Sequence, residues 1–403
     1  MTAANSIPSD AARPAGSLSA PRFGSYSQWV RDVIRKVRSE RTLLISLFES
    51  SVPEPVELLH EIIREAFGET ITTRYASAFA GGNPYVIEQL AARYGVERDR
   101  VLCTTGATGA LSLLYRALLS PGDRILVETP GFDIFDTVAR SLNLPVDRFV
   151  RRGEDFAIDP DEVERAMTPQ TRLILLSNLH NPSGMAIAPE VLAAIARMAE
   201  ARGAVVVVDE VYGEYAGSEF SPAASGTWSP ALVSVSSLTK IWGLSTLRCG
   251  WIVAHPDVMG PVRTLNREVE FGVSNLAHAV AALVLEQRER FESYRVGMLR
   301  RARPIMESYH AQWLAEGLMS GSLPAHGCIA FPRAVGVDNT EHFSEWLADR
   351  CGVVVVPGEH FGAPGHIRIG FAHAPEDVEF GLQALTDGLR RYRALDRDER
   401  KGG

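Results

Sequence analysis

The sequence predicts an α/β protein with a large domain, built on a mostly parallel sheet covered by helices, and a smaller α+β domain formed from both chain ends. Between residues 101 and 254, short apolar runs alternate with helical patterns, which indicates a parallel sheet with helices on it. The runs are almost continuously apolar, as in strands buried on both faces. A chain of 403 residues is long enough for two or three domains.

The segment before the sheet is mainly helical. Pro53 and Pro55 interrupt the pattern, because proline does not continue a helix or a strand ladder. In chain order we expect a helix beginning at Tyr26, an extended run at Leu43–Phe48, a helix at Val56–Phe67, a loop at Thr72–Pro84 and a helix ending at Tyr94.

The alternating region supplies the expected sheet and its covering helices. The predicted strands are Val101–Thr104, Arg124–Val127, Leu173–Ser177, Ala204–Val208, Leu232–Val235 and Gly250–Ala254. The predicted helices between them are Ala107–Leu119, Ile134–Leu142 and Pro189–Ala201. Further on we expect one long helix or two in line at Ala277–Met306, then strands near Cys328–Pro332, Val353–Val356 and Ile367–Gly370.

These elements give the expected domain boundaries. The large domain covers 71–292, and the smaller one combines 25–70 with 293–395. Residues 1–24 are rich in Ala, Ser and Pro and lack the apolar centre of a signal peptide, so 1–24 and 396–403 are expected to be tails.

Composition excludes several classes of protein. A net charge of −8 and a pI near 5.8 disfavour a nucleic-acid surface. The longest apolar runs fall short of the ~20 residues that span a bilayer. The four cysteines have no short paired spacing, so neither a zinc site nor a disulfide framework is expected. We therefore expect a cytoplasmic protein that binds no metal, no membrane and no nucleic acid.

One lysine stands out because lysine is so rare in this chain. Of three lysines, Lys36 and Lys401 lie in terminal segments, and Lys240 alone lies inside the folded body. Arginine cannot replace lysine as an amine nucleophile, since its guanidinium stays protonated. This pattern indicates Schiff-base chemistry at Lys240. A chance surface lysine in an arginine-rich chain is the alternative that the count alone leaves open.

Other polar signals follow the predicted strands. They are Gly106–Gly109, Asn181–Gly184, Asp209–Tyr212 and the pair Lys240 and Arg248. Ligands of open α/β sheets bind where the carboxyl ends of strands lead into loops. Each signal alone is also typical of an ordinary turn or helix cap. Their order and spacing together are what indicate a ligand site.

With these residues in view, the chain resembles the fold-type I, pyridoxal-5′-phosphate (PLP)-dependent aminotransferases of class I/II, over about residues 40–390. The likeness is strongest at Ser237-Leu-Thr-Lys-x7-Arg248, which is similar to the family's Ser-x-Ser-Lys-x7-Arg. It implies an aspartate-aminotransferase-like fold and an enzyme that transfers amino groups in a ping-pong cycle. Its substrates would be an α-amino acid and a 2-oxo acid, and it would be a homodimer.

The resemblance also implies roles for single residues. Lys240 would form the internal aldimine with PLP and then act as general base and acid. The cofactor phosphate would contact Ala107, Thr108, Ser237, Thr239 and Arg248. The cofactor ring would contact Phe132 by stacking, Asp209 at its nitrogen, and Asn181 and Tyr212 at its phenolic oxygen. Arg368, together with Asn181, would bind the substrate carboxylate.

The segment facing the substrate departs from the family. The usual Leu-x-x-Gly-x-Pro-like pattern is replaced by Leu47-Phe-Glu-Ser-Ser-Val-Pro53. Glu49 in this segment predicts a cationic or strongly hydrogen-bonding substrate, such as a basic amino acid, unless that carboxylate faces solvent or pairs with an arginine. His180 either lines the pocket or makes ordinary loop hydrogen bonds. Tyr75 is the candidate for the tyrosine that reaches the partner's phosphate, although its spacing to Gly82 differs from the family's.

Two other functions remain as alternatives. The altered segment is compatible with another PLP reaction on the same fold: a lyase, cyclase, decarboxylase or oxidase. The turn at residues 105–110 has some likeness to a nicotinamide-dinucleotide turn, with Glu128 near the ribose position. That second alternative lacks the third glycine and leaves Lys240 and Arg248 without a role.

Overall fold

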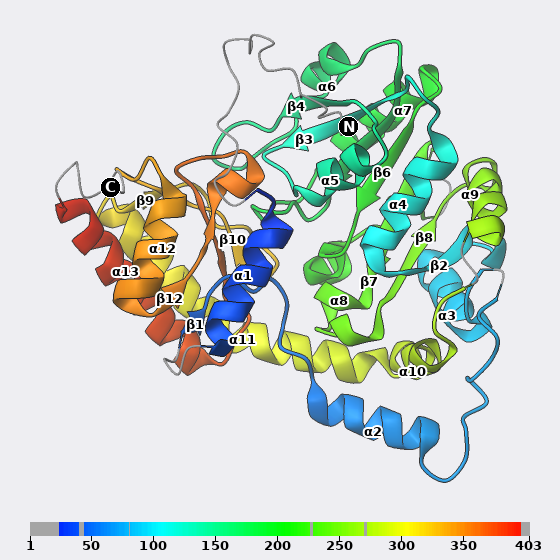
Figure 1. The fold of residues 1–403 in the computed structure, drawn as a ribbon, viewed down its shortest axis with the longest axis horizontal. Coiled ribbons are helices and arrows are strands. Elements are labelled where there is room, and N and C mark those ends of the chain that lie inside the picture. The colour runs from blue at the N-terminus through cyan, green and yellow to red at the C-terminus, as the bar shows by residue number, and fades with distance from the viewer. Residues whose placement is uncertain (1–23, 40–43, 80, 226–228, 270–271, 396–403) are drawn as a thin grey trace, which may run out of the picture.

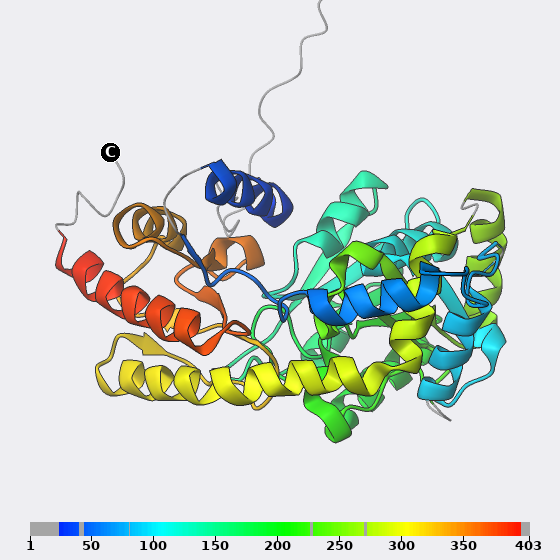
Figure 2. The same ribbon diagram turned by 90° about the horizontal axis from the view of Figure 1, so that it is seen from below.

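The computed structural model describes residues 24–39, 44–79, 81–225, 229–269 and 272–395. The two predicted tails lie outside these residues, except for Gly24. Within the described part, two bodies lie side by side, and helices α10 (Asn275–Glu286) and α11 (Arg288–Ala315) follow one another along both (Figures 1 and 2).

A seven-stranded sheet forms the larger body. Its strand order is β2 (Val101–Thr105), β8 (Cys249–Val253), β7 (Leu232–Ser237), β6 (Val205–Asp209), β5 (Thr171–Ser177), β3 (Arg124–Thr129) and β4 (Val146–Val150). β8 is antiparallel to both of its neighbours, and the remaining pairs are parallel. The predicted mostly parallel sheet is thus confirmed.

Successive side chains along the strands belong alternately to two cores, one on each face of the sheet. Ile125 and Val127 of β3 belong to the core beneath helices α4 (Gly106–Leu118), α5 (Ile134–Ser141) and α9 (Pro256–Val269). Leu126, between them, belongs to the core beneath α6 (Pro160–Ala166) and α7 (Pro189–Ala201). Strands covered on both faces bury every side chain, which explains their continuous apolar runs.

Among the elements of the larger body without a predicted counterpart are β4, α6 and α9. β4, with the sequence Val-Asp-Arg-Phe-Val, lies at the sheet edge and is only partly buried, so it lacks a continuous apolar run. α9 contains Pro261, which masks a helical pattern. The long helical stretch at 277–306 proves to be two helices, α10 and α11, separated at Gln287.

The smaller body is built from both ends of the described chain. Its elements are α1 (Tyr26–Ser39), β1 (Ile45–Ser46), β9 (Met319–Ser320), β10 (Ile329–Ala330), β11 (Arg333–Ala334), α12 (Thr340–Cys351), β12 (Val353–Val354), β13 (Val356–Pro357), β14 (Ile367–Gly370) and α13 (Pro375–Ala394). β1 pairs in parallel with β12, which ties the N-terminal segment to C-terminal residues. A separate apolar core joins α11, α12 and α13.

Helix α2 (Val56–Phe67) corrects one predicted assignment. We expected residues 25–70 to belong to the smaller domain, but α2 packs against α10, which also contacts helix α3 (Pro84–Tyr94) (Figure 1). Ile62 and Ala66 are fully buried there, in a core of the larger body. The reason is that Ile62 and Ala66, with the partly buried Leu58, Leu59 and Phe67, form an apolar face that needs a surface to cover it. The other proposed domain boundaries stay predictions.

The described residues also show what the fold offers for membrane insertion, metal binding and disulfide formation. No helix in this part of the chain is long and apolar enough to cross a membrane. Nor does this part bring three or more His, Cys, Asp or Glu side chains together as a metal site. All four cysteines are free thiols.

Candidate active site

The polar signals of the sequence gather at one edge of the sheet. β5, β6 and β7 run parallel, so their carboxyl ends lie at the same edge. β2 and β7 are both antiparallel to β8, and β2 therefore ends at that edge too. The structure thus brings Asn181, Asp209, Lys240 and the first turn of α4 to one place, as expected for an open α/β sheet.

Lys240 lies in the short helix α8 (Leu238–Ile241), directly after β7. Its backbone oxygen accepts a hydrogen bond of 2.7 Å from the hydroxyl of Tyr215. Its amine donates to Ser50 Oγ over 2.9 Å. Burial, helped by the positive charge of Arg368, lowers the pKa of Lys240 to about 8. A larger share of this amine is therefore neutral near pH 7 than of an ordinary lysine.

Asp209 ends β6 and is almost fully buried. Its Oδ1 accepts a hydrogen bond of 3.1 Å from Val211 N. Burial raises the pKa of Asp209 to about 6, and Lys240 and the Val211 bond act against that rise. A cationic ring nitrogen placed beside this carboxylate would lower its pKa and keep it ionised.

Tyr212 follows on the same loop and is also buried, and its Oη has no hydrogen-bond partner. Burial raises the pKa of Tyr212, so the hydroxyl keeps its proton. A buried hydroxyl without a partner is costly, because it has lost its water. Tyr212 therefore has a proton free to donate to an acceptor placed at this edge.

Arg248 and the first turn of α4 form a second polar group. Arg248 is exposed, and its Nη2 donates to Thr105 O over 3.3 Å. Gly106 has a φ of +81°, and a Cβ there would lie 2.7 Å from Arg248 Nη2. Glycine thus leaves room for the guanidinium beside the unpaired N–H groups at the start of α4, where Ala107 and Thr108 lie. Ser237 caps α8 by accepting from Thr239 N.

Arg368 comes from β14 of the smaller body and is buried to 1% exposure. Its Nη1 donates to Asn181 Oδ1 over 2.9 Å, which leaves the Asn181 amide NH₂ available as a donor. Its Nη2 donates to the hydroxyl of Tyr26 over 2.6 Å and to Phe48 O over 3.1 Å. Its Nε has no partner, although it is buried.

Helix α1 covers Arg368. The ring of Tyr26, the first residue of α1, lies 5.1 Å from the guanidinium carbon and 5.7 Å from the ring of Phe132. Its backbone N–H donates to Asp133 Oδ2 over 2.7 Å. Phe132, the predicted stacking residue, thus lies between the sheet edge and α1 and is partly buried.

Two groups of residues face this site. We call Asp209, Tyr212, Lys240 and Arg248 the cofactor wall, and Tyr26, Ser50 and Arg368 the substrate wall. Sequence reasoning missed Tyr26, Ser50 and Tyr215. Ser50 lay inside the segment flagged as unusual, so a signal for it was present. Tyr26 had none, because it looks like any aromatic residue at a helix start.

His180, Glu49 and Tyr75, whose roles the sequence left open, lie in different places. His180 is fully buried, and its ring nitrogens lie 2.6 Å from Ser183 Oγ and 2.9 Å from Pro130 O, the ordinary hydrogen bonds of a loop. Glu49 is exposed, and its charge raises the pKa of Lys240. Tyr75 is 45% exposed and lies beside Phe67, away from both walls of this chain.

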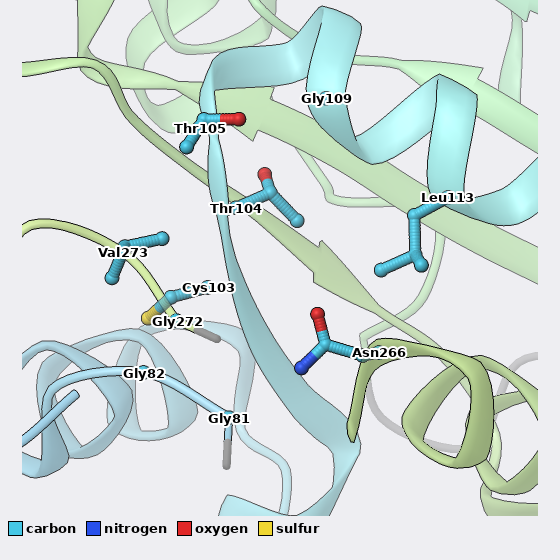
Figure 3. A pocket seen from close by; sticks show the side chains of 10 residues that line it. All are labelled: Gly81, Gly82, Cys103, Thr104, Thr105, Gly109, Leu113, Asn266, Gly272 and Val273. Atoms are coloured by element: carbon cyan, nitrogen blue, oxygen red, sulfur yellow. The ribbon is translucent and has the colours of Figure 1, made fainter. Parts of the chain in front are cut away.

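A small pocket on the larger body borders this site, because its lining includes Thr105, whose carbonyl accepts from Arg248, and Gly109 of the first turn of α4 (Figure 3). It is lined by Gly81, Gly82, Cys103, Thr104, Thr105, Gly109, Leu113, Asn266, Gly272 and Val273. None of these belongs to either wall. Gly82 is needed there, because a Cβ would lie 2.3 Å from Cys103 Sγ.

The donors and acceptors of the cofactor wall fit PLP. A phosphate suits Arg248 and the free N–H groups of α4, since both are positive in character. A protonated ring nitrogen suits Asp209, and a phenolic oxygen suits the unpartnered hydroxyl of Tyr212. The amine of Lys240 suits the aldehyde. The two cations, the carboxylate and the unpartnered hydroxyl of the wall are thus each matched by one group of the cofactor.

Comparisons with known proteins agree with this geometry. The arginine–pyruvate transaminase of Pseudomonas aeruginosa is 27% identical over 380 residues, 90% of this chain and 91% of that protein. The aspartate aminotransferase structure from Thermus thermophilus has a TM-score of 0.76 at 23% identity, over 90% of this chain and 96% of that one. The structure of the PLP-dependent cyclase OrfR has a TM-score of 0.75 at 26% identity, over 95% and 100%.

The expected aspartate-aminotransferase-like fold is therefore confirmed, and so is PLP as the cofactor. Residues 62–385 match the family described as aminotransferase class I and II. This match leaves the nicotinamide-dependent alternative without support. The protein is an enzyme, and the chain belongs to the aminotransferase class I and II family.

Proposed function

We propose that this aminotransferase takes the amino group from an α-amino acid whose carboxylate binds Arg368, and passes it to a 2-oxo acid in a ping-pong cycle. The observation that carries the proposal is the pair formed by Lys240 and Arg368. The amine of Lys240 has a lowered pKa, and the charge of Arg368 contributes to that shift. An amine that exchanges protons and a cation that holds a carboxylate thus face one space.

PLP, when bound, supplies an electron sink for negative charge at the substrate α-carbon. Arg368 would hold the substrate carboxylate through its planar fork of donors, and this orients the α-carbon. Lys240 would remove and return the proton at that carbon, since its pKa near 8 suits both tasks close to neutral pH.

The cofactor wall would hold the group that receives this charge. Asp209 would keep the ring nitrogen protonated, and Tyr212 and Asn181 would donate hydrogen bonds to the phenolic oxygen. Arg248, Ala107, Thr108, Ser237 and Thr239 would bind the phosphate, and Phe132 would stack on the ring. These roles combine the family resemblance with the positions described above.

A half-reaction tests the proposal. The PLP-loaded enzyme is mixed with single amino donors, and conversion of its cofactor to pyridoxamine phosphate is followed by absorbance and chromatography. We expect conversion with at least one α-amino acid and recovery of PLP when a 2-oxo acid is added. Product formed from an amino acid without any conversion would overturn the proposal.

That contrary result would favour the second candidate, a cyclase or lyase. The likeness to the PLP-dependent cyclase OrfR over the whole of that chain is the observation that favours it. The altered segment at 47–53 supplies Ser50 to the substrate wall. Amino transfer and a cyclase or lyase reaction would be expected to differ in what this wall contacts.

We further propose that the enzyme acts as a cytoplasmic homodimer. Large apolar side chains are exposed on the segment that carries Tyr75 and near the junction of α9 and α10: Ile71, Tyr75, Phe79, Val269 and Leu276. An isologous contact would cover this surface in both subunits. It would also bring the partner's Tyr75 within reach of the phosphate. Sedimentation at working concentration tests the assembly, and an active monomer would contradict it.

A further inference from the structure

Ser50 lies against the amine of Lys240, where the family pattern has no side chain. Counted from Leu47, Ser50 takes the position of the glycine in Leu-x-x-Gly-x-Pro. Its Oγ accepts the hydrogen bond from Lys240 Nζ over 2.9 Å, and the residue is 4% exposed. The contact joins segments 190 residues apart. It is therefore a product of the tertiary fold and not of a local turn.

The segment that carries Ser50 is fixed to the smaller body before this residue. Leu47 N donates to Val354 O over 3.0 Å, and Gly370 N donates to Leu47 O over 2.7 Å. Gly370 also lets the chain pass close by, because a Cβ there would lie 1.6 Å from Glu49 O. Any other residue at 370 would displace the strand that carries Arg368 or the segment that carries Ser50.

After Ser50 the same segment is fixed to the larger body. Gly243, three residues beyond Lys240, has a φ of +72°. A Cβ at this position would lie 2.5 Å from Val52 O and 2.7 Å from Pro53 O. Two close glycine contacts thus hold Ser50 between β14 and the helix of Lys240. The backbone that carries the hydroxyl thus has little freedom to move away from the amine.

We propose that Ser50 is a positioning residue for Lys240: its hydroxyl receives the lysine amine whenever that amine is not bonded to the cofactor, and fixes the direction from which it exchanges a proton with the substrate. The inference rests on the proposed function, because it assigns the proton transfer to Lys240. The amine keeps its bonds throughout and donates one N–H to Ser50 Oγ. The family glycine has no atom that accepts this bond.

The position of Ser50 predicts the direction in which its removal changes the amine. A hydroxyl oxygen that accepts from an ammonium stabilises the charged form more than the neutral form. Loss of the hydroxyl should therefore make Lys240 more acidic, by roughly threefold to tenfold in its acid constant. The other groups that act on this amine are Arg368, Cys328, Glu49 and Asp209, and all of them stay in place in the variant.

Because the chain has only three lysines, the titration of the Lys240 amine can be measured in the loaded enzyme. With pyridoxamine phosphate as the bound cofactor, the Lys240 amine is free. Trace labelling with acetic anhydride across a pH series, followed by peptide mass spectrometry, gives its titration relative to Lys36 in the same sample. The variants are Ser50→Ala, Ser50→Gly and Ser50→Thr, and Ser51→Ala is the control on the adjacent serine.

We expect the Lys240 titration to move to lower pH in Ser50→Ala and Ser50→Gly. It should stay near the wild-type position in Ser50→Thr, which keeps a hydroxyl, and in Ser51→Ala. Exchange of the donor's α-proton for deuterium should slow by about tenfold, which is less than the ~10²–10⁴-fold that a whole acid–base group contributes, with KM changed less than twofold.

A wild-type titration of Lys240 in both Ser50→Ala and Ser50→Gly would overturn the proposal. If the alanine variant does not load cofactor, the glycine variant carries the test, because it has the residue found in the family pattern. Failure here is distinct from failure of the proposed function. A wrong role for Lys240 itself would appear as wild-type α-proton exchange in Lys240→Ala.

Discussion

Asp209 and Lys240 follow the ends of adjacent parallel strands, whereas Tyr26, Ser50 and Arg368 come together from three distant segments. The hydrogen bond between Tyr26 and Arg368 spans 342 positions of the sequence. The cofactor wall is therefore built by the topology of one sheet, and the substrate wall by the docking of chain ends. With the roles proposed above, the larger body would fix the chemistry of the cofactor, while the choice of substrate would depend on how the two bodies meet.

The largest effect is expected on the cofactor wall, at Lys240. Lys240→Ala should lower turnover by ~10⁴-fold or more, because it removes both the nucleophile and the general base. Stopped-flow assays and thermal unfolding of the same preparation would measure it. Lys36→Ala is the control, since Lys36 is a lysine of α1 that belongs to neither wall. Turnover within tenfold of wild type would show that the wall is wrongly assigned.

The rate at which PLP attaches to the cofactor-free enzyme should depend on pH in a way that reports Lys240. Only the neutral amine attacks an aldehyde, and burial lowers the pKa of Lys240 from 10.5 to about 8. The rate should rise from pH 6 to about 8 and then level off. A rate that still climbs tenfold per unit above pH 9 would indicate an ordinary, exposed lysine.

On the substrate wall, Arg368→Lys should reduce kcat/KM by roughly tenfold to a hundredfold. A lysine keeps the charge but loses the planar fork and the bond to Asn181. Steady-state kinetics with the best donor and with its α-amide, which lacks the carboxylate, would show the loss only for the acid. Arg333→Lys, on an exposed arginine of β11, is the matched control.

A smaller effect is expected for Tyr26→Phe, which keeps the ring over Arg368 and removes the hydroxyl. We predict an increase of roughly threefold to tenfold in KM for the donor, as for one lost hydrogen bond of about 0.5–1.5 kcal/mol. Tyr85→Phe removes a hydroxyl from α3, outside both walls, and should leave KM unchanged. A drop in stability with an unaltered KM would make Tyr26 a purely structural residue.

An effect of similar size concerns Glu49, which sequence reasoning linked to a cationic donor. Glu49→Gln should lower the preference for basic over neutral donors by about threefold to tenfold. It should also lower the pKa of Lys240, since the Glu49 charge raises that pKa. A donor panel on both enzymes would measure the preference. A wild-type preference for apolar or acidic donors, unchanged in the variant, would dismiss the idea.

The same contrast explains what could be predicted from sequence. Asp209 ends β6, Lys240 follows β7 closely and Arg248 directly precedes β8, so a local pattern placed each of them at the end of an apolar strand. Ser50 and Tyr26 have no such pattern, since their partners lie in other parts of the chain. α2 was assigned to the wrong body because the direction taken after Pro55 depends on burial against α10, and no local signal encodes that.

The account rests most directly on one measurement: borohydride reduction of the PLP-loaded enzyme followed by peptide mapping. Reduction makes the bond between cofactor and lysine permanent, so the modified peptide identifies the residue. We expect the modification on the peptide that contains Lys240 and on no other. Modification of Lys36 or Lys401 in its place would contradict the assignment of both walls, because each is defined by its position around Lys240.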